Sequence, residues 1–171
     1  MARSAVMLRQ ACRLIPFERS IPAGVQISAE LVWRREGWLE LSYGVLARAA
    51  KGIGVLKLPE ELNDGPQQGQ RKDELWATTC FEAFIAAPEE QRYWEVNLAA
   101  NGDWALYRFD GYRSGQTQQE LSTPPTVRLQ RGLHQLRLDA RIALEPWWTP
   151  CLLYTSPSPR DVEESRMPSS A

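Results

Sequence analysis

Two glutamates are the clearest candidates for acid/base chemistry. Glu82 and Glu95 each interrupt an otherwise apolar stretch, CFEAFIAA at 80–87 and YWEVNLA at 93–99. If these stretches pair as strands, the two carboxylates can meet across the sheet, and burial together would raise a pKa and suit them to proton transfer. The alternative is a structural role, in which both accept hydrogen bonds from Arg or Asn side chains. We weigh the structural role more heavily, because such networks perturb carboxylates as readily as catalysis does.

Aromatic and amide side chains near these glutamates are candidates for sugar binding. The chain has seven tryptophans. Trp76 and Trp104 are expected at strand ends beside polar loops, where a ring can stack on the apolar C–H face of a saccharide. Asn97 alternates in step with Glu95, so both are expected on one face of their strand. The alternative for both tryptophans is that they close the hydrophobic core, as tryptophan does in most folded chains.

The elements that would position these residues are strands. Apolar and polar residues alternate with a period of two, most clearly in 25–34, 39–45 and 136–142. The sequence Arg35-Glu36-Gly37 between the first two stretches predicts a hairpin turn. A short helical turn is expected over 46–51. Many short strands separated by turns favour an all-β fold, an antiparallel β-sandwich.

The glutamates and Asn97 belong to a predicted three-stranded meander. Its strands are 80–87, 93–99 and 104–109, and Asn101-Gly102-Asp103 is a strong turn signal between the last two. Because 80–87 is apolar at nearly every position, we expect it to be a central strand covered on both faces.

Several functional classes are not indicated. The net charge of −1 leaves no basic surplus for nucleic acid, and no apolar run approaches the ~20 residues of a membrane helix. The N-terminal residues make a poor secretory signal, so a cytoplasmic protein is expected. His134 is the lone histidine and no cysteine pair has metal-ligand spacing, so we expect no metal site. No cofactor is expected, since phosphate-binding and flavin fingerprints are absent, and Cys12 and Cys80 are expected to be free and buried.

The last 21 residues are predicted to be foreign to the protein. Residues 151–171, CLLYTSPSPRDVEESRMPSSA, resemble a sequencing-library adapter translated in one frame. We therefore expect one native domain at 8–150 and a disordered, non-native tail at 151–171. The sandwich is then expected to be incomplete at its C-terminus, with Trp147 and Trp148 lacking cover.

The region 75–113 resembles the DOMON-like family, which is related to family 9 carbohydrate-binding modules. The resemblance is closest to small bacterial members, some of which carry a MurB-like label, and it extends weakly over 8–150. It rests on Trp76, CFEAF at 80–84, EVN at 95–97, NGDW at 101–104 and FDGY at 109–112. The family implies a β-sandwich that binds a ligand, sugar or haem, rather than an enzyme. Haem-binding relatives use Met and His ligands, which the lone His134 does not match, and the reductase activity that the MurB-like label implies lacks a flavin fingerprint here.

Three functional hypotheses follow. The first is a non-catalytic ligand-binding β-sandwich for a small molecule, most simply a saccharide, with Trp76, Glu82, Glu95, Asn97 and Trp104 as candidate binding residues. The second is an enzyme that acts on a sugar-like substrate with Glu82 and Glu95 as its acid/base pair. The third is a protein-interaction module without a small ligand.

Overall fold

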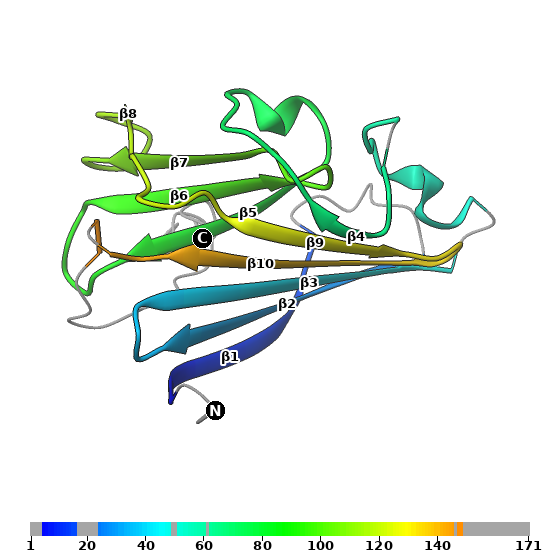
Figure 1. The fold of residues 1–171 in the computed structure, drawn as a ribbon, viewed down its shortest axis with the longest axis horizontal. Helices are drawn as coiled ribbons and strands as arrows, with labels where there is room; N and C mark the ends of the chain where they lie inside the picture. Colours follow the sequence, from blue (N-terminus) through cyan, green and yellow to red (C-terminus); the bar gives the residue numbers. More distant parts are fainter. Residues whose placement is uncertain (1–4, 17–23, 49–50, 61, 146, 149–171) are drawn as a thin grey trace, which may run out of the picture.

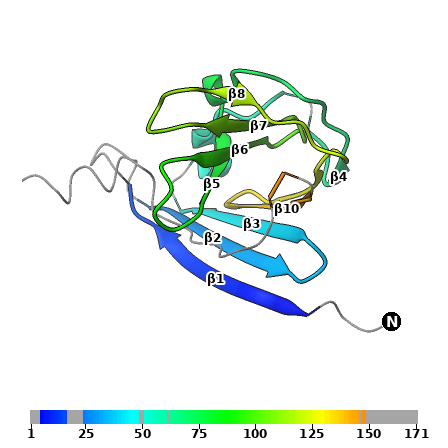
Figure 2. The same cartoon turned by 90° about the vertical axis from the view of Figure 1, so that its left-hand side faces the viewer.

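The alternating stretches fold into strands whose apolar sides face one another across a single interior. The computed structural model describes residues 5–16, 24–48, 51–60, 62–145 and 147–148. Two antiparallel sheets stack as a β-sandwich, so the predicted all-β fold class is confirmed (Figures 1 and 2). Within the described residues there is no α-helix, only the two short 3₁₀ helices η1 (Gly52–Val55) and η2 (Leu75–Ala77).

The larger sheet has six strands in the order β1-β2-β3-β10-β9-β4, and the smaller has four in the order β5-β6-β7-β8. The six-stranded sheet consists of β1 (Val6–Leu14), β2 (Val25–Arg34), β3 (Trp38–Ala47), β10 (Gln135–Ala143), β9 (Thr126–Arg131) and β4 (Gly65–Gln67). The four-stranded sheet consists of β5 (Cys80–Ala86), β6 (Tyr93–Ala99), β7 (Trp104–Phe109) and β8 (Thr117–Gln118).

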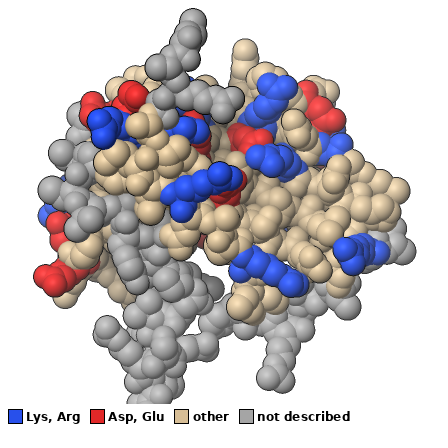
Figure 3. All heavy atoms as spheres, turned by 90° about the horizontal axis from the view of Figure 1, so that it is seen from below, with Lys and Arg blue, Asp and Glu red and all other residues tan. Residues whose placement is uncertain are grey.

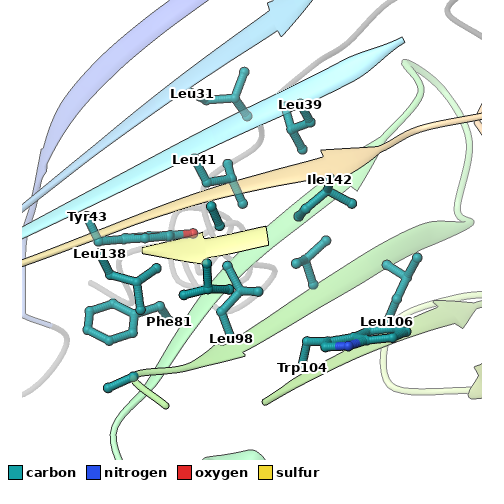
Figure 4. Close-up of a cluster of buried hydrophobic side chains, with 14 of the residues drawn as sticks. Leu31, Leu39, Leu41, Tyr43, Phe81, Leu98, Trp104, Leu106, Leu138 and Ile142 are labelled. Atoms are coloured by element: carbon teal, nitrogen blue, oxygen red, sulfur yellow. The ribbon is translucent and has the colours of Figure 1, made fainter. Parts of the chain in front are cut away.

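The core lies between the two sheets. Leu39, Leu98 and Leu138 come from different strands and are fully buried, and Figure 4 shows such side chains pointing toward one another from both sheets. Tyr43 adds a polar link, because its hydroxyl donates to the backbone oxygen of Glu82 at 2.8 Å and so joins β3 to β5. Burial raises the pKa of Tyr43, which keeps this hydroxyl protonated and able to donate.

Several predicted elements are confirmed. Strands β6 and β7 have the predicted bounds, and β5, β6 and β7 form the predicted meander. The turns at 35–37 and around 101–103 are also present. Gly102 adopts φ of +90° there, and its carbonyl comes so close to Gly69 that a Cβ on Gly69 would stand 1.8 Å from it. Glycine is therefore required at both positions of this crossing.

Other expectations are wrong. Strand β5 is an edge strand of its sheet, and Glu82 on it is exposed, so the strand covered on both faces is β6 instead. The helical turn expected over 46–51 does not form in the described part of that range, since β3 continues to Ala47 and η1 begins at Gly52. Strands β1 and β9 were not predicted. Leu8 is the one residue of β1 that is not exposed, so its sequence carries no buried face to signal a strand.

The two tryptophans expected to lack cover are packed. Trp148 is buried and meets the ring of Trp94 edge to face, with centroids 4.9 Å apart. Trp147 lies against the same ring, and its indole N–H donates to the oxygen of Ala143 at 2.8 Å. The segment 151–171, which we interpret as adapter-derived, lies outside the described residues. No helix in the described ranges is both long and apolar enough to cross a bilayer.

Candidate functional site

The outer face of the four-stranded sheet brings three of the predicted site residues together. In the β5–β6 register, Glu82 lies opposite Asn97 and Phe84 lies opposite Glu95. Because side chains alternate between faces, Glu82, Asn97 and Glu95 all project from the face turned away from the core. Glu82 is thus the cross-strand neighbour of Asn97, and Glu95 is two residues before Asn97 on the same strand. The two glutamates are therefore diagonal neighbours in the sheet, as expected from the sequence if these strands pair.

Asn97 is the fixed centre of this group. Its side chain is fully buried, and its Nδ2 donates to Oε1 of Glu95 at 2.8 Å. Its Oδ1 accepts a long hydrogen bond from the Cys80 thiol at 3.5 Å. Since both ends of the amide are engaged, Asn97 holds one Glu95 oxygen in place and leaves the other carboxylate oxygen to be satisfied elsewhere.

A loop covers one end of this face and carries Trp76. Helix η2 lies against β5 and β6, with Leu75 buried among the apolar residues of the outer face. Trp76 follows directly and is 53% exposed. Glu74, which precedes η2, has φ of +59°, a left-handed conformation that turns the chain sharply at this point. Leu75 therefore anchors the loop, while the Trp76 ring stays available at the edge of the sheet.

Tyr107 supplies a second polar group on the same face. It lies opposite Glu95 in β7, and its hydroxyl donates to Oδ1 of Asp73 at 2.6 Å. Arg71 forms an ion pair with Asp73 at 3.2 Å and lies over the Tyr107 ring. The side-chain amide of Gln118 lies against the Arg71 guanidinium. Sequence reasoning missed Arg71 and Asp73 because the loop that brings them to the sheet carries no motif, and it did not single out Tyr107 on β7.

These contacts set the charge states of Asp73 and Tyr107. The hydrogen bond from Tyr107, together with Arg71, holds the pKa of the Asp73 carboxyl below its usual value. Burial, followed by the hydrogen bond to Asp73, raises the pKa of Tyr107 to about 12. At neutral pH the face therefore presents an ionised Asp73 and a protonated phenol.

Aromatic rings border the cluster of polar side chains on this face. Tyr93 and Phe109 stack at 4.7 Å with their planes 2° apart, and Phe84 lies 6.1 Å from Tyr93. Glu82, Glu95 and Asn97 are thus bounded by apolar side chains on the side away from η2. A face with a few placed polar groups amid apolar rings is the usual composition of a small-molecule site.

Trp104 is placed apart from the other candidates. It lies on the inner side of β7, is 7% exposed and belongs to the hydrophobic core (Figure 4). The sequence left two roles open for Trp104, sugar stacking and core packing, and the structure places it in the core. Its indole is not accessible from the outer face, so the structure leaves Trp104 out, whereas Trp76 belongs to helix η2, which lies against β5 and β6.

Comparison of the chain with protein-family models, with curated proteins and with solved structures finds no match. Function is therefore inferred from the geometry of the described residues. Among them no cluster of three or more His, Cys, Asp or Glu side chains is arranged to hold a metal ion. Cys12 and Cys80 are free thiols, as expected, but neither is fully buried, since Cys12 is exposed and Cys80 is half-buried.

Replacement of Cys80 by serine is expected to reduce the amount of unfolding free energy that the protein loses at alkaline pH. Burial raises the pKa of the Cys80 thiol from 9.0 to about 12. The folded chain therefore keeps a proton that the unfolded chain releases, so this contribution is present below pH 9 and is lost as the pH rises toward 12. Serine does not ionise in this range and retains a donor for Asn97. Urea unfolding at pH 7 and about pH 10 measures the difference, and equal losses in Cys80→Ser and the parent chain would contradict it.

Proposed function

We propose that this chain is a non-catalytic ligand-binding β-sandwich that holds a saccharide-like molecule on the outer face of its four-stranded sheet. The observation that carries the proposal is the register that sets Glu82, Asn97 and Glu95 side by side. The carboxylates of Glu82 and Glu95 can accept hydrogen bonds from several hydroxyls at once, and the buried Asn97 holds Glu95 in position. The resemblance to the DOMON-like family is consistent with this class of ligand.

Trp76 supports the apolar half of such recognition. A sugar ring has an apolar C–H face and a polar rim, and its binding is favoured where an exposed ring adjoins fixed polar groups. Trp76 is exposed beside β5 and β6, and Leu75 anchors its backbone. The Asn97–Glu95 hydrogen bond is already formed without ligand, which lowers the ordering cost of binding.

Loss of the Trp76 ring is expected to weaken saccharide binding at least about tenfold, as truncation of a central aromatic anchor does. The full chain would be screened on a glycan array, and the best ligand would then be titrated by calorimetry. Tyr112→Ala is the matched control, since Tyr112 is also an exposed aromatic ring, at 44%, but lies beyond β7. The proposal fails if no saccharide binds, or if Trp76→Ala and Tyr112→Ala bind equally well.

The enzyme alternative is favoured by one observation, the diagonal placement of Glu82 and Glu95 on one face. If the pair performs acid/base catalysis, Glu82→Gln is expected to lower turnover of the bound saccharide by about a hundredfold or more. Product analysis after prolonged incubation separates the two functions. A saccharide that binds the parent chain and is recovered intact excludes the enzyme, and turnover that Glu82→Gln abolishes excludes the non-catalytic proposal.

A further inference from the structure

The outer face of the six-stranded sheet, on the opposite side of the sandwich from the proposed saccharide site, is rich in arginine. Among its described residues the strand registers place six arginines and three carboxylates, namely Arg9, Arg13, Arg34, Arg128, Arg137 and Arg141 with Glu30, Glu40 and Asp139. Figure 3 views the molecule from below, the side of β1, β2 and β3 in Figure 1, and shows basic side chains spread across it. The chain as a whole carries a net charge of −1, so the positive excess is a property of this face.

One row of four residues across this face forms a shallow trough, because small side chains lie in its middle and long ones at its ends. Arg13, Ser28, Gly44 and Arg137 lie opposite one another on β1, β2, β3 and β10. The two small residues are in the middle and the two arginines are at the ends, which are roughly 14 Å apart at a strand spacing of about 4.8 Å. A hollow of about 430 Å³ lies over this row and is lined by all four residues. Such a volume suits a small molecule.

Gly44 keeps the floor of the trough open. It lies in the middle of the ten-residue strand β3, where a glycine weakens the strand and often marks the close approach of another group. A Cβ at this position would stand 2.8 Å from Oγ of Ser28. Among the described residues, Ser28 Oγ makes only a long hydrogen bond, 3.4 Å, to the oxygen of Gly44, so this hydroxyl can turn to a ligand.

Asp139 holds Arg137, one of the two arginines at the ends of the trough, in place. Arg137 donates from Nε to both Asp139 oxygens at 3.0 and 2.9 Å, and Ser42 donates to the same carboxylate at 2.6 Å. These bonds hold the guanidinium while its Nη1 atom makes no hydrogen bond to the described residues. Arg13, at the other end, has no carboxylate partner in the described ranges, and the nearby Glu30 is paired with Arg9. Glu30 also lines the hollow, so the positive charge without a carboxylate partner among the described residues is that of Arg13 on the β1 side.

We propose that this trough binds a small molecule through an oxyanion group, carboxylate or phosphate, held between Arg13 and Arg137 with Ser28 as a further donor. The guanidinium fork matches the paired oxygens of both groups. Arginine donors over an open floor favour an anion over a neutral ligand, because binding forms charge-assisted hydrogen bonds. Arg137 is already held by Asp139, so its part of the ordering cost is small. This site is separate from the saccharide site and does not depend on it.

The test is titration of the full chain with inorganic phosphate and with succinate, at constant ionic strength, followed by NMR chemical shifts. Saturable shifts are expected at Ser28 and Gly44 with at least one of the two probes, and which probe binds identifies the oxyanion. Arg13→Gln and Arg137→Gln are each expected to weaken binding about tenfold, the usual size of a lost charge-assisted hydrogen bond.

Arg141→Gln is the matched control. It removes one positive charge from the same face, but Arg141 stacks on Trp38 and does not line the hollow. We expect it to weaken binding less than about twofold, because an exposed charge outside the site acts only through a screened field. Equal losses in all three variants would mean diffuse attraction to the face and would overturn the proposal, as would the absence of saturable shifts with both anions.

Discussion

Trp94→Ala is expected to cost about 3–5 kcal/mol of unfolding free energy, the range for removing a large buried aromatic side chain. Trp94 lies on the inner face of β6 and is 7% exposed. Its ring contacts Trp147 and Trp148, which follow β10, and its indole N–H donates to Gln119 at 3.3 Å. One side chain therefore joins the four-stranded sheet to the end of the six-stranded one.

Urea unfolding monitored by circular dichroism measures this loss, and Trp76→Ala provides the comparison. Trp76 is the same residue type but is half exposed, so its truncation is expected to change the unfolding free energy by no more than about 0.5 kcal/mol. The pair separates stability from binding, because Trp76→Ala is expected to lose ligand while staying folded. A loss below about 1 kcal/mol for Trp94→Ala would contradict the packing of the three tryptophans.

The second large effect is expected at the centre of the candidate site, where Asn97→Asp should cost about 3 kcal/mol at pH 7. The substitution hardly changes volume, but it replaces the donor Nδ2 with an acceptor 2.8 Å from Glu95 Oε1. The position is fully buried, so two carboxylates cannot both be ionised there without a severe penalty. The introduced carboxyl group is expected to keep its proton to an unusually high pH.

The pH dependence of this variant follows from that raised pKa. The folded state holds the extra proton more tightly than the unfolded chain, so the destabilisation is small below about pH 4 and grows as the pH rises above it. Chemical unfolding of the variant and the parent chain at pH 7 and about pH 4 gives the difference. Asn63→Asp, on an exposed loop, is the control and is expected to change stability little at either pH. A pH-independent cost at position 97 would show that the loss is steric.

The meander illustrates how much of the fold the sequence carries. The strand at 93–99, the strand at 104–109 and the turn between them are local features, set by alternation and by Asn101-Gly102-Asp103. The register that follows from this tight turn puts Glu95 and Asn97 on one face before any tertiary contact is considered. The shared face of Glu95 and Asn97 was predictable for that reason, whereas the position of Glu82 beside Asn97 depends on the β5–β6 register.

The two tryptophan candidates show where local reasoning ends. Trp76 and Trp104 both stand beside polar loops in the sequence, yet one is exposed and the other lies in the core. Alternation assigns residues to two faces but does not say which face another sheet will cover. Strand β1 was missed for a related reason, since it is an edge strand with almost no buried side chain, and its ladder with β2 defines it rather than its composition.

By itself the sequence determined the all-β class, the meander and the shared face of Glu95 and Asn97, because each depends on neighbours in the chain. Only the tertiary structure decided that a loop brings Arg71, Asp73 and Trp76 to the outer face, and that β10 pairs with β3 so that Arg137 and Arg13 enclose one hollow. Ser42 and Asp139, which support that hollow, are 97 residues apart in the chain. Contacts of such separation are set by the way whole sheets bury their apolar faces, and no short-range pattern records them.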